Sequence, residues 1–195
     1  MTAEGRGSPA EEKPWRLFVA ADVPEAVRSR LADELEPLRE SHPDLRWSPR
    51  ENWHVTLKFL GAVRPALVPD AERAVAAVAA VTSRFETHLL GADAFPSAGR
   101  ARVLWIGMSD PAERFRSLAA SLDTALEGIV KAEERQFTPH LTVARSKRPL
   151  PLEEDLTAVS GTVSDTFPID HLTLYRSHLR RPAPLYEPVE AFSIT

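Results

Sequence analysis

The order strand, capped helix, H-x-T strand occurs twice in this chain, and this repeat restricts the fold more than any other feature of the sequence. Asp22, expected to cap the first helix, corresponds to Asp110 in the second copy, and His54 corresponds to His140. The apolar runs before the helices are 15–21 and 102–107, and the H-x-T strands are 53–60 and 138–145. Because a solenoid needs at least three repeats, two copies predict two pseudo-symmetric lobes that share a cleft.

Both expected helices carry one apolar face, as a helix that packs on a sheet must. In the first helix, spacings of three and four residues align Val27, Leu31, Leu35 and Leu38. A third helix is expected to begin at Pro69, and further strands are expected at 85–90, 167–175 and 186–192. The first half of the domain would cover about 15–92 and the second about 93–195.

Composition narrows the class of protein. Residues 1–14 are small, charged and aperiodic, so we expect a disordered tail before a single domain at 15–195. The chain contains no cysteine, which excludes thiolate nucleophiles and zinc-finger frameworks and favours the reducing cytoplasm. It shows neither a signal-peptide core nor the apolar stretch of roughly 20 residues that a membrane span needs.

The formal net charge of −4 argues against a protein that coats nucleic acid generally. Neither GxGxxG nor GxxxxGK is present, so a glycine-rich phosphate loop is not expected. Local cations would still attract an RNA end. The candidates for such a basic rim, or for scattered surface charge, are Arg100, Arg102, Lys147, Arg148, Arg176, Arg180 and Arg181.

The paired H-x-T segments carry the chemistry. Side chains two residues apart on a strand share a face, so His54 stands beside Thr56 and His140 beside Thr142. One neutral imidazole can take a proton from water while an imidazolium gives a proton to a leaving oxygen, and the hydroxyls can hold phosphate oxygens. This set suits phosphodiester hydrolysis without a metal or other cofactor.

A third H-x-T segment begins at His171, but no capped helix and paired strand precede it in the matching order. We therefore expect His171 to be non-catalytic. A single H-x-T can also be an ordinary half-buried strand histidine beside a β-favouring threonine. The repeated context is what separates His54 and His140 from that alternative.

Together, the segments RLFVAADVP, NWHVTLKFLG, FTPHLTVAR and LYRSHL, with a late tyrosine, resemble the 2H phosphoesterase superfamily. More narrowly they resemble the RNA 2′,3′-cyclic phosphodiesterases, also called 2′-5′ RNA ligases. The resemblance implies a bilobal α+β fold with antiparallel sheets along a central cleft and helices outside. It also implies metal-independent hydrolysis of RNA 2′,3′-cyclic phosphate ends to 2′-phosphates, and in some members the reverse 2′-5′ joining.

Carried over residue by residue, the resemblance makes His54 the proton donor and His140 the proton acceptor. It assigns Thr56, Thr142 and Arg145 to phosphate binding. Phe59 matches a family aromatic near the nucleobase. Strict alternation would point Phe59 and Arg145 away from the histidines, so a β-bulge or a strand end is required for each. The glycine that usually precedes the late tyrosine is replaced by Arg181, Pro182 and Pro184.

Other residues have two interpretations each. Lys58 alternates onto the His54 face and would contact phosphate or remain a solvated lysine. Trp47, Trp53 and Trp105 are expected in the core or between the lobes rather than as base-stacking platforms.

Two rival functions remain at this point. The first is a non-catalytic module of the same fold that binds a nucleotide or RNA end, and a related alternative is hydrolysis of another small cyclic nucleotide. The second is a metallo-phosphodiesterase, although HExxH and HxHxD are absent. The expected ligands are RNA 2′,3′-cyclic phosphate ends or 2′,3′-cyclic nucleotides, and the expected protein is a cytoplasmic monomer without membrane attachment.

Overall fold

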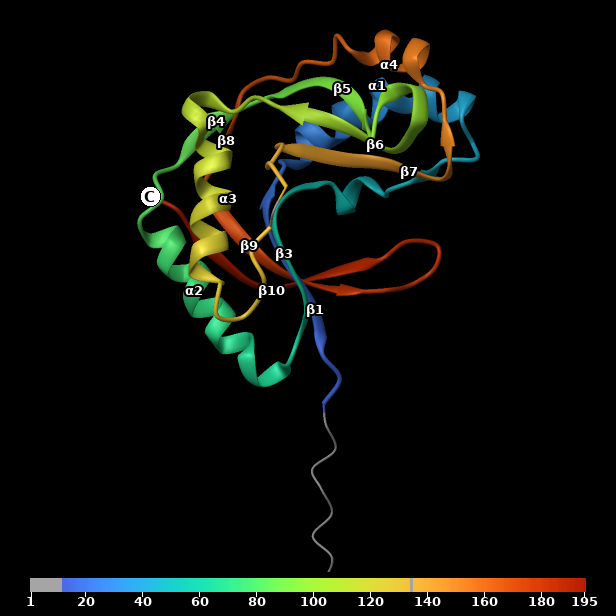
Figure 1. Cartoon of the computed structure of the whole chain (residues 1–195). Helices are drawn as coiled ribbons and strands as arrows, with labels where there is room; N and C mark the ends of the chain where they lie inside the picture. Colours follow the sequence, from blue (N-terminus) through green and yellow to red (C-terminus); the bar gives the residue numbers. More distant parts are fainter. Residues whose placement is uncertain (1–11, 134) are drawn as a thin grey trace, which may run out of the picture.

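The computed structural model describes residues 12–133 and 135–195 (Figure 1). Most of the expected tail, residues 1–11, lies outside the described residues, and residues 12–14 are exposed without regular secondary structure. None of the helices in the described part of the chain combines the length and apolar character that a bilayer crossing requires.

The elements follow the predicted order. The strands are β1 (Trp15–Asp22), β2 (Arg46–Trp47), β3 (His54–Val63), β4 (Phe85–Thr87), β5 (Leu89–Phe95), β6 (Ala101–Met108), β7 (His140–Leu150), β8 (Phe167–Ile169), β9 (His171–His178) and β10 (Leu185–Ser193). The α-helices are α1 (Glu25–Ser41), α2 (Val68–Ala80), α3 (Arg114–Ala125) and α4 (Glu153–Val159), and the 3₁₀ turns are η1 (Arg50–Asn52), η2 (Pro65–Leu67), η3 (Ala98–Arg100) and η4 (Pro111–Glu113).

The predicted α+β class with antiparallel strands is confirmed. One eight-stranded sheet has the order β10-β9-β1-β3-β7-β6-β5, with β2 added beside β7, and β4 pairs with β8 in a separate small sheet. Each H-x-T strand has the strand of its own copy as a neighbour, since β3 pairs with β1 and β7 pairs with β6.

The two halves of the sequence interleave in space (Figure 1). The C-terminal strands β9 and β10 extend the sheet beside β1, and β2 from the first half pairs with β7 from the second. The first half's α1 contacts α4, whereas the second half's α3 packs on β3 and α2. A boundary near residue 92 therefore separates the copies along the chain but not in the sheet.

Helices cover one face of the sheet, and the opposite face carries the H-x-T side chains. Val55 and Leu141 are fully buried in the core, so their neighbours His54 and His140 point to the other side. We call this second side the histidine face. Trp53 is buried and Trp47 packs at the edge of the core, as predicted.

Candidate active site

The two copies of the H-x-T strand meet at one residue pair. Val55 of β3 lies opposite Leu141 of β7 in antiparallel register, and this is the pair that joins the two parts of the large sheet. Both side chains face the core and have no solvent exposure. The contact therefore fixes where the two histidines stand relative to each other.

Continued by one residue in each direction, this register places His54 opposite Thr142 and His140 opposite Thr56. Diagonal neighbours on such a face lie about 7–8 Å apart, with their Cβ atoms somewhat closer, and His54 and His140 are diagonal neighbours in this register. Consistent with that proximity, His140 is one of the groups that lower the pKa of His54. Two imidazoles and two hydroxyls thus surround one point on the histidine face.

A β-bulge follows each H-x-T segment at the same position. The pairing of β1 with β3 skips Leu57, and the pairing of β6 with β7 skips Val143. Each extra residue reverses the alternation of the side chains that follow it. Phe59 and Arg145 therefore lie on the histidine face, both exposed; of the two predicted alternatives, a bulge or a strand end, the structure has a bulge in each strand.

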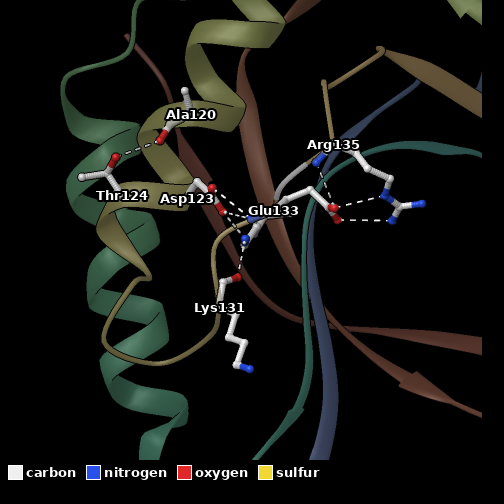
Figure 2. A network of polar contacts seen from close by, with 7 residues as sticks. Ala120, Asp123, Thr124, Lys131, Glu133 and Arg135 are labelled. Carbon is white, nitrogen blue, oxygen red and sulfur yellow. Dashed lines mark hydrogen bonds and ion pairs between the residues drawn. The ribbon is translucent and has the colours of Figure 1, made fainter.

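The same bulge corrects the prediction for Lys58. This side chain does not share the face of His54 but is turned into the interior, where it is only 5% exposed. Its ammonium pairs with the Asp123 carboxylate of α3 and donates to the Lys131 carbonyl at 3.0 Å. Asp123 also accepts the Glu133 backbone N–H (Figure 2). Lys58 thus links β3 to α3 and points away from the histidine face.

His54 is held as a neutral ring. Its Nε2 lies 3.0 Å from the Thr56 hydroxyl, and the ring also hydrogen-bonds the backbone of Asn52. Burial lowers the pKa of His54 to about 4, while the Asp22 carboxylate and the Asn52 bond act in the opposite direction. The Asn52 side chain in turn donates to the Pro184 carbonyl at 2.8 Å, which links this segment to the β9–β10 hairpin.

His140 has a parallel arrangement. Its Nδ1 lies 2.7 Å from the Thr138 carbonyl, again two residues earlier in the chain. A carbonyl can only accept, so Nδ1 is the donor and Nε2 of the neutral ring is left as a proton acceptor. Burial lowers the pKa of His140, and the Arg145 guanidinium lowers it further, against the raising effect of the Thr138 bond.

Aromatic rings flank both histidines. Phe18 of β1 stacks on His54 with 4.8 Å between ring centroids. Phe95 and Trp105 lie 5.2 and 5.7 Å from the His140 ring. Trp105 was expected in the core or between the lobes; it is half-buried outside the core, because its register position on β6 faces the same side as the H-x-T hydroxyl of β7, and whether it stacks on a base is untested.

The C-terminal strand completes this surface. The Tyr186 ring of β10 meets His54 edge-on at 5.3 Å, and Phe59 lies 6.1 Å from Phe18. Burial raises the pKa of Tyr186, and the positive charge of Arg145 acts against that rise. Arg145 of β7 therefore acts electrostatically on groups on both sides of the strand crossing.

The third H-x-T segment lies beside the site rather than in it. Asp22 pairs with His54 across β1 and β3, and on its other side it accepts from Thr173 and Tyr175, each at 2.7 Å. His171 Nε2 lies 3.1 Å from the same carboxylate. Burial lowers the pKa of His171, but the Asp170 carboxylate, 2.6 Å from Nδ1, and the Asp22 carboxylate together raise it above the usual value.

Asp22 is not the helix cap that the sequence predicted. Helix α1 is preceded by Pro24, and no side chain caps it. The carboxylate is used on the sheet instead, where the row His54, Asp22, His171 crosses three strands. In this register the counterpart of Asp22 is Gly107, the partner of the second histidine, rather than Asp110.

The cations predicted to form a basic rim make few specific contacts with the described residues. Arg176 lies over the Trp15 ring at 3.9 Å. The other six cations are exposed and form no side-chain ion pair with the described residues; they are Arg100, Arg102, Lys147, Arg148, Arg180 and Arg181. Their grouping into one RNA-attracting rim stays a prediction.

Two hollows of the surface lie away from the histidines. One, of about 230 Å³, lies between α1 and the segment 162–165, and the other, of about 360 Å³, lies between α1 and Trp47 and Trp53. Within residues 12–133 and 135–195, no three His, Asp or Glu side chains are grouped so that they could hold a metal ion. Catalysis without a metal stays a prediction.

Comparison with known proteins gives a consistent result. The family profile described as the 2′-5′ RNA ligase superfamily matches residues 23–181. The RNA 2′,3′-cyclic phosphodiesterase of Methanothermobacter thermautotrophicus is 30% identical over 182 residues, covering 92% of this chain and 98% of that protein. The enzyme of the same name from Thermus thermophilus is 31% identical over 188 residues, covering 92% and 90%.

Solved structures agree with the fold. The crystal structure of TT0787 of Thermus thermophilus superposes with a TM-score of 0.77 at 29% identity, covering 92% of this chain and 97% of that one. E. coli LigT complexed with 3′-AMP superposes with a TM-score of 0.71 at 26% identity, covering 93% and 99%.

Proposed function

The chain belongs to the 2′-5′ RNA ligase superfamily, and on this basis we propose that it hydrolyses 2′,3′-cyclic phosphate ends of RNA to 2′-phosphates through His54 and His140. The observation that carries this proposal is the single Val55–Leu141 pair, which sets both H-x-T segments around one point. A phosphorus atom at that point lies between two imidazoles and beside two hydroxyls.

The reaction balances with one proton taken and one given. The Nε2 of His140 accepts a proton from a water molecule as the water oxygen attacks phosphorus. The P–O3′ bond breaks, and His54 donates a proton to the departing 3′ oxygen. The products are a 2′-phosphate and a 3′-hydroxyl, and proton exchange with solvent restores both rings.

The charges beside the two rings support this order of roles. The Asp22 carboxylate next to His54 favours the imidazolium that an acid needs. The Arg145 guanidinium next to His140 favours the neutral imidazole that a base needs. In the free protein burial lowers both pKa values, and the negative charge of a bound phosphodiester would raise them again.

Three further side chains have the position to bind the substrate. Thr56 and Thr142 alternate with the histidines on the two strands and can donate to non-bridging phosphate oxygens. Arg145 adds a charged, forked donor on the same face. Phe59, 65% exposed at the edge of the aromatic cluster, is the residue we assign to the nucleobase.

The direct test uses an RNA oligonucleotide with a 2′,3′-cyclic phosphate end and follows formation of the 2′-phosphate in the presence of EDTA. We expect His54→Ala and His140→Ala each to lose at least about a hundredfold in kcat, because each removes a proton-transfer group. His171→Ala is the matched control and should stay within a few-fold of wild type. Binding without turnover by the wild-type protein would favour the non-catalytic module, and inactivation by EDTA would favour the metal-dependent rival.

The same assay with an RNA that carries a 5′-hydroxyl end tests the 2′-5′ joining. A 2′-5′ linkage formed from a 2′,3′-cyclic end and a 5′-hydroxyl end would use the same two groups in the same roles, because the 5′-hydroxyl takes the place of water, the P–O3′ bond breaks and the 3′ oxygen receives the proton. We expect it to be lost in the same two variants.

We also propose that residues 15–195 form one monomeric domain in the cytoplasm. Strands from both halves share one sheet, which supports a single unfolding unit, and the absence of cysteine supports a reducing compartment. One calorimetric transition and a monomer mass by light scattering are the expected results.

A further inference from the structure

Two arginines face each other beside the proposed site. Arg46 of the short strand β2 lies directly opposite Arg145 of β7 in antiparallel register. Directly opposed residues of an antiparallel pair project from the same face of the sheet. Arg46 therefore stands on the histidine face, on the same side of β7 as β3, at a position that the sequence pattern did not single out.

Neither guanidinium is neutralised by the part of the chain that the structure describes. Both side chains are exposed, and neither forms an ion pair or side-chain hydrogen bond with the described residues. Other arginines of this region do have carboxylate partners: Arg28 and Arg50 both pair with Glu25. Like charges directly opposed across a sheet are unfavourable, so the sheet gains nothing from this pair by itself.

The backbone nevertheless holds Arg46 in place. The next residue, Trp47, turns to the opposite face, packs at the core and donates its indole N–H to the His42 carbonyl at 3.1 Å. Beyond it, the Ser48 N–H donates to the Val143 carbonyl at 2.8 Å, at the bulge of β7. The two residues that follow Arg46 are thus fixed, and the orientation of Arg46 follows from that.

From this we infer that Arg46 is a binding residue for a second phosphate, that of the nucleotide preceding the cyclic end, so that the site prefers an RNA chain to a mononucleotide. The inference rests on the proposed function, because it takes Arg145 as the contact to the reacting phosphate. Two uncompensated guanidiniums side by side match two successive phosphates of one strand. A mononucleoside 2′,3′-cyclic phosphate has only one phosphate and leaves Arg46 unused.

The test compares two substrates in one assay. One is a mononucleoside 2′,3′-cyclic phosphate, and the other is a dinucleotide with one internal phosphate and the same cyclic end. For Arg46→Ala we expect a loss of about tenfold in kcat/KM on the dinucleotide and no change on the mononucleotide, as for one lost charged hydrogen-bonding contact. Arg46→Lys should recover part of the loss, because it keeps the charge and loses the fork.

Salt provides a second measurement. For the dinucleotide, the slope of log kcat/KM against log salt should fall by about 0.7 in Arg46→Ala, the value for one phosphate contact on a single strand. Arg64→Ala is the matched control, since Arg64 is also exposed and follows β3 at the end about 30 Å from His54. It should change neither the slope nor the rates.

The outcomes separate this inference from the proposed function. If wild type hydrolyses the mononucleotide but Arg46→Ala loses activity equally on both substrates, or on neither, the second-phosphate assignment is wrong while the proposed reaction stands. If wild type hydrolyses neither substrate, the proposed function itself fails. Thermal unfolding checks the fold of each variant, and a lower melting temperature for Arg46→Ala would also overturn the inference, because relief of the opposed charges should leave stability equal or higher.

Discussion

Removal of the Asp123 carboxylate would leave the Lys58 ammonium in the interior without its counter-ion. Lys58 is 5% exposed and, among residues 12–133 and 135–195, would keep only the Lys131 carbonyl as an acceptor. Breaking a buried ion pair from one side costs about 3–5 kcal/mol, a large share of the roughly 5–15 kcal/mol by which a domain is stable. With a urea m-value of about 2 kcal/mol/M, Asp123→Ala should move the unfolding midpoint down by about 1.5–2.5 M.

Lys58→Met is the informative partner variant. It removes the buried charge and keeps an apolar chain of similar length, while Asp123 keeps the Glu133 N–H and partial contact with water. We expect a cost of about 1–2 kcal/mol, and we expect Lys58→Met/Asp123→Ala to be more stable than Asp123→Ala alone. Equilibrium urea denaturation of the four proteins gives the coupling free energy directly.

The activity of Lys58→Met tests the position of the bulge at Leu57 of β3. The skipped Leu57 turns Lys58 away from the histidine face, so Lys58→Met should keep kcat/KM within about twofold of wild type at a temperature where it is folded. A variant with a native urea midpoint and a tenfold loss of activity would show that Lys58 faces the substrate. The position of the bulge, and with it the placement of Phe59, would then be refuted.

Three other perturbations have defined outcomes. The pKa of His54 is about 4 in the folded protein and 6.5 unfolded, so the unfolded state binds more protons between these values and stability falls as pH drops through them. Wild type should lose up to about 3 kcal/mol more than His54→Gln between pH 6.5 and 4 in urea titrations; equal losses would contradict the burial of this ring. Asp22→Asn removes a charge that raises the pKa of His54, so the alkaline limb of the kcat profile should move to lower pH, and an unmoved limb would count against His54 as the acid. Asn52→Ala should lower kcat and speed amide exchange in the β9–β10 hairpin, because Asn52 holds the hairpin through its side chain and the His54 ring through its backbone; a change in only one of them would separate the two roles.

Local pattern predicted the elements well because their signals are local. Alternation at residues 53–60 and the apolar face of α1 each follow from neighbouring residues on one strand or one helix. The neighbours of each strand are a different matter. β9 pairs with β1, whereas β2 pairs with β7. Which strand edges are free for these pairings depends on the whole sheet, so no short segment of the sequence encodes the choice.

The residues of the candidate site also divide into those with a local sequence signal and those placed by the pairing of strands. The repeat predicted His54 and His140, but Asp22 has the same local signature as a helix cap, an aspartate two residues before a proline, and is used on the sheet instead. Trp105 and Arg46 come to the histidine face only through cross-strand register. Arg46 could have been identified from the sequence only if a pattern had marked the β-bulge at Val143, because the segment 46–48 pairs with β7 at that bulge.

The duplication explains why two histidines meet, and the divergence of the copies explains why they can differ in role. Asp22 beside His54 has Gly107 as its counterpart beside His140. That glycine cannot be replaced by an aspartate without rearrangement, because a Cβ there would collide with the Leu90 carbonyl oxygen.

Five residues after each histidine, the first copy has an uncharged aromatic residue and the second has a guanidinium. The negative charge is thus confined to the His54 side by backbone packing, and the positive charge stands on the His140 side. A symmetric pair of imidazoles would exchange acid and base roles freely, whereas under the proposed mechanism this arrangement would assign one role to each ring before the substrate arrives.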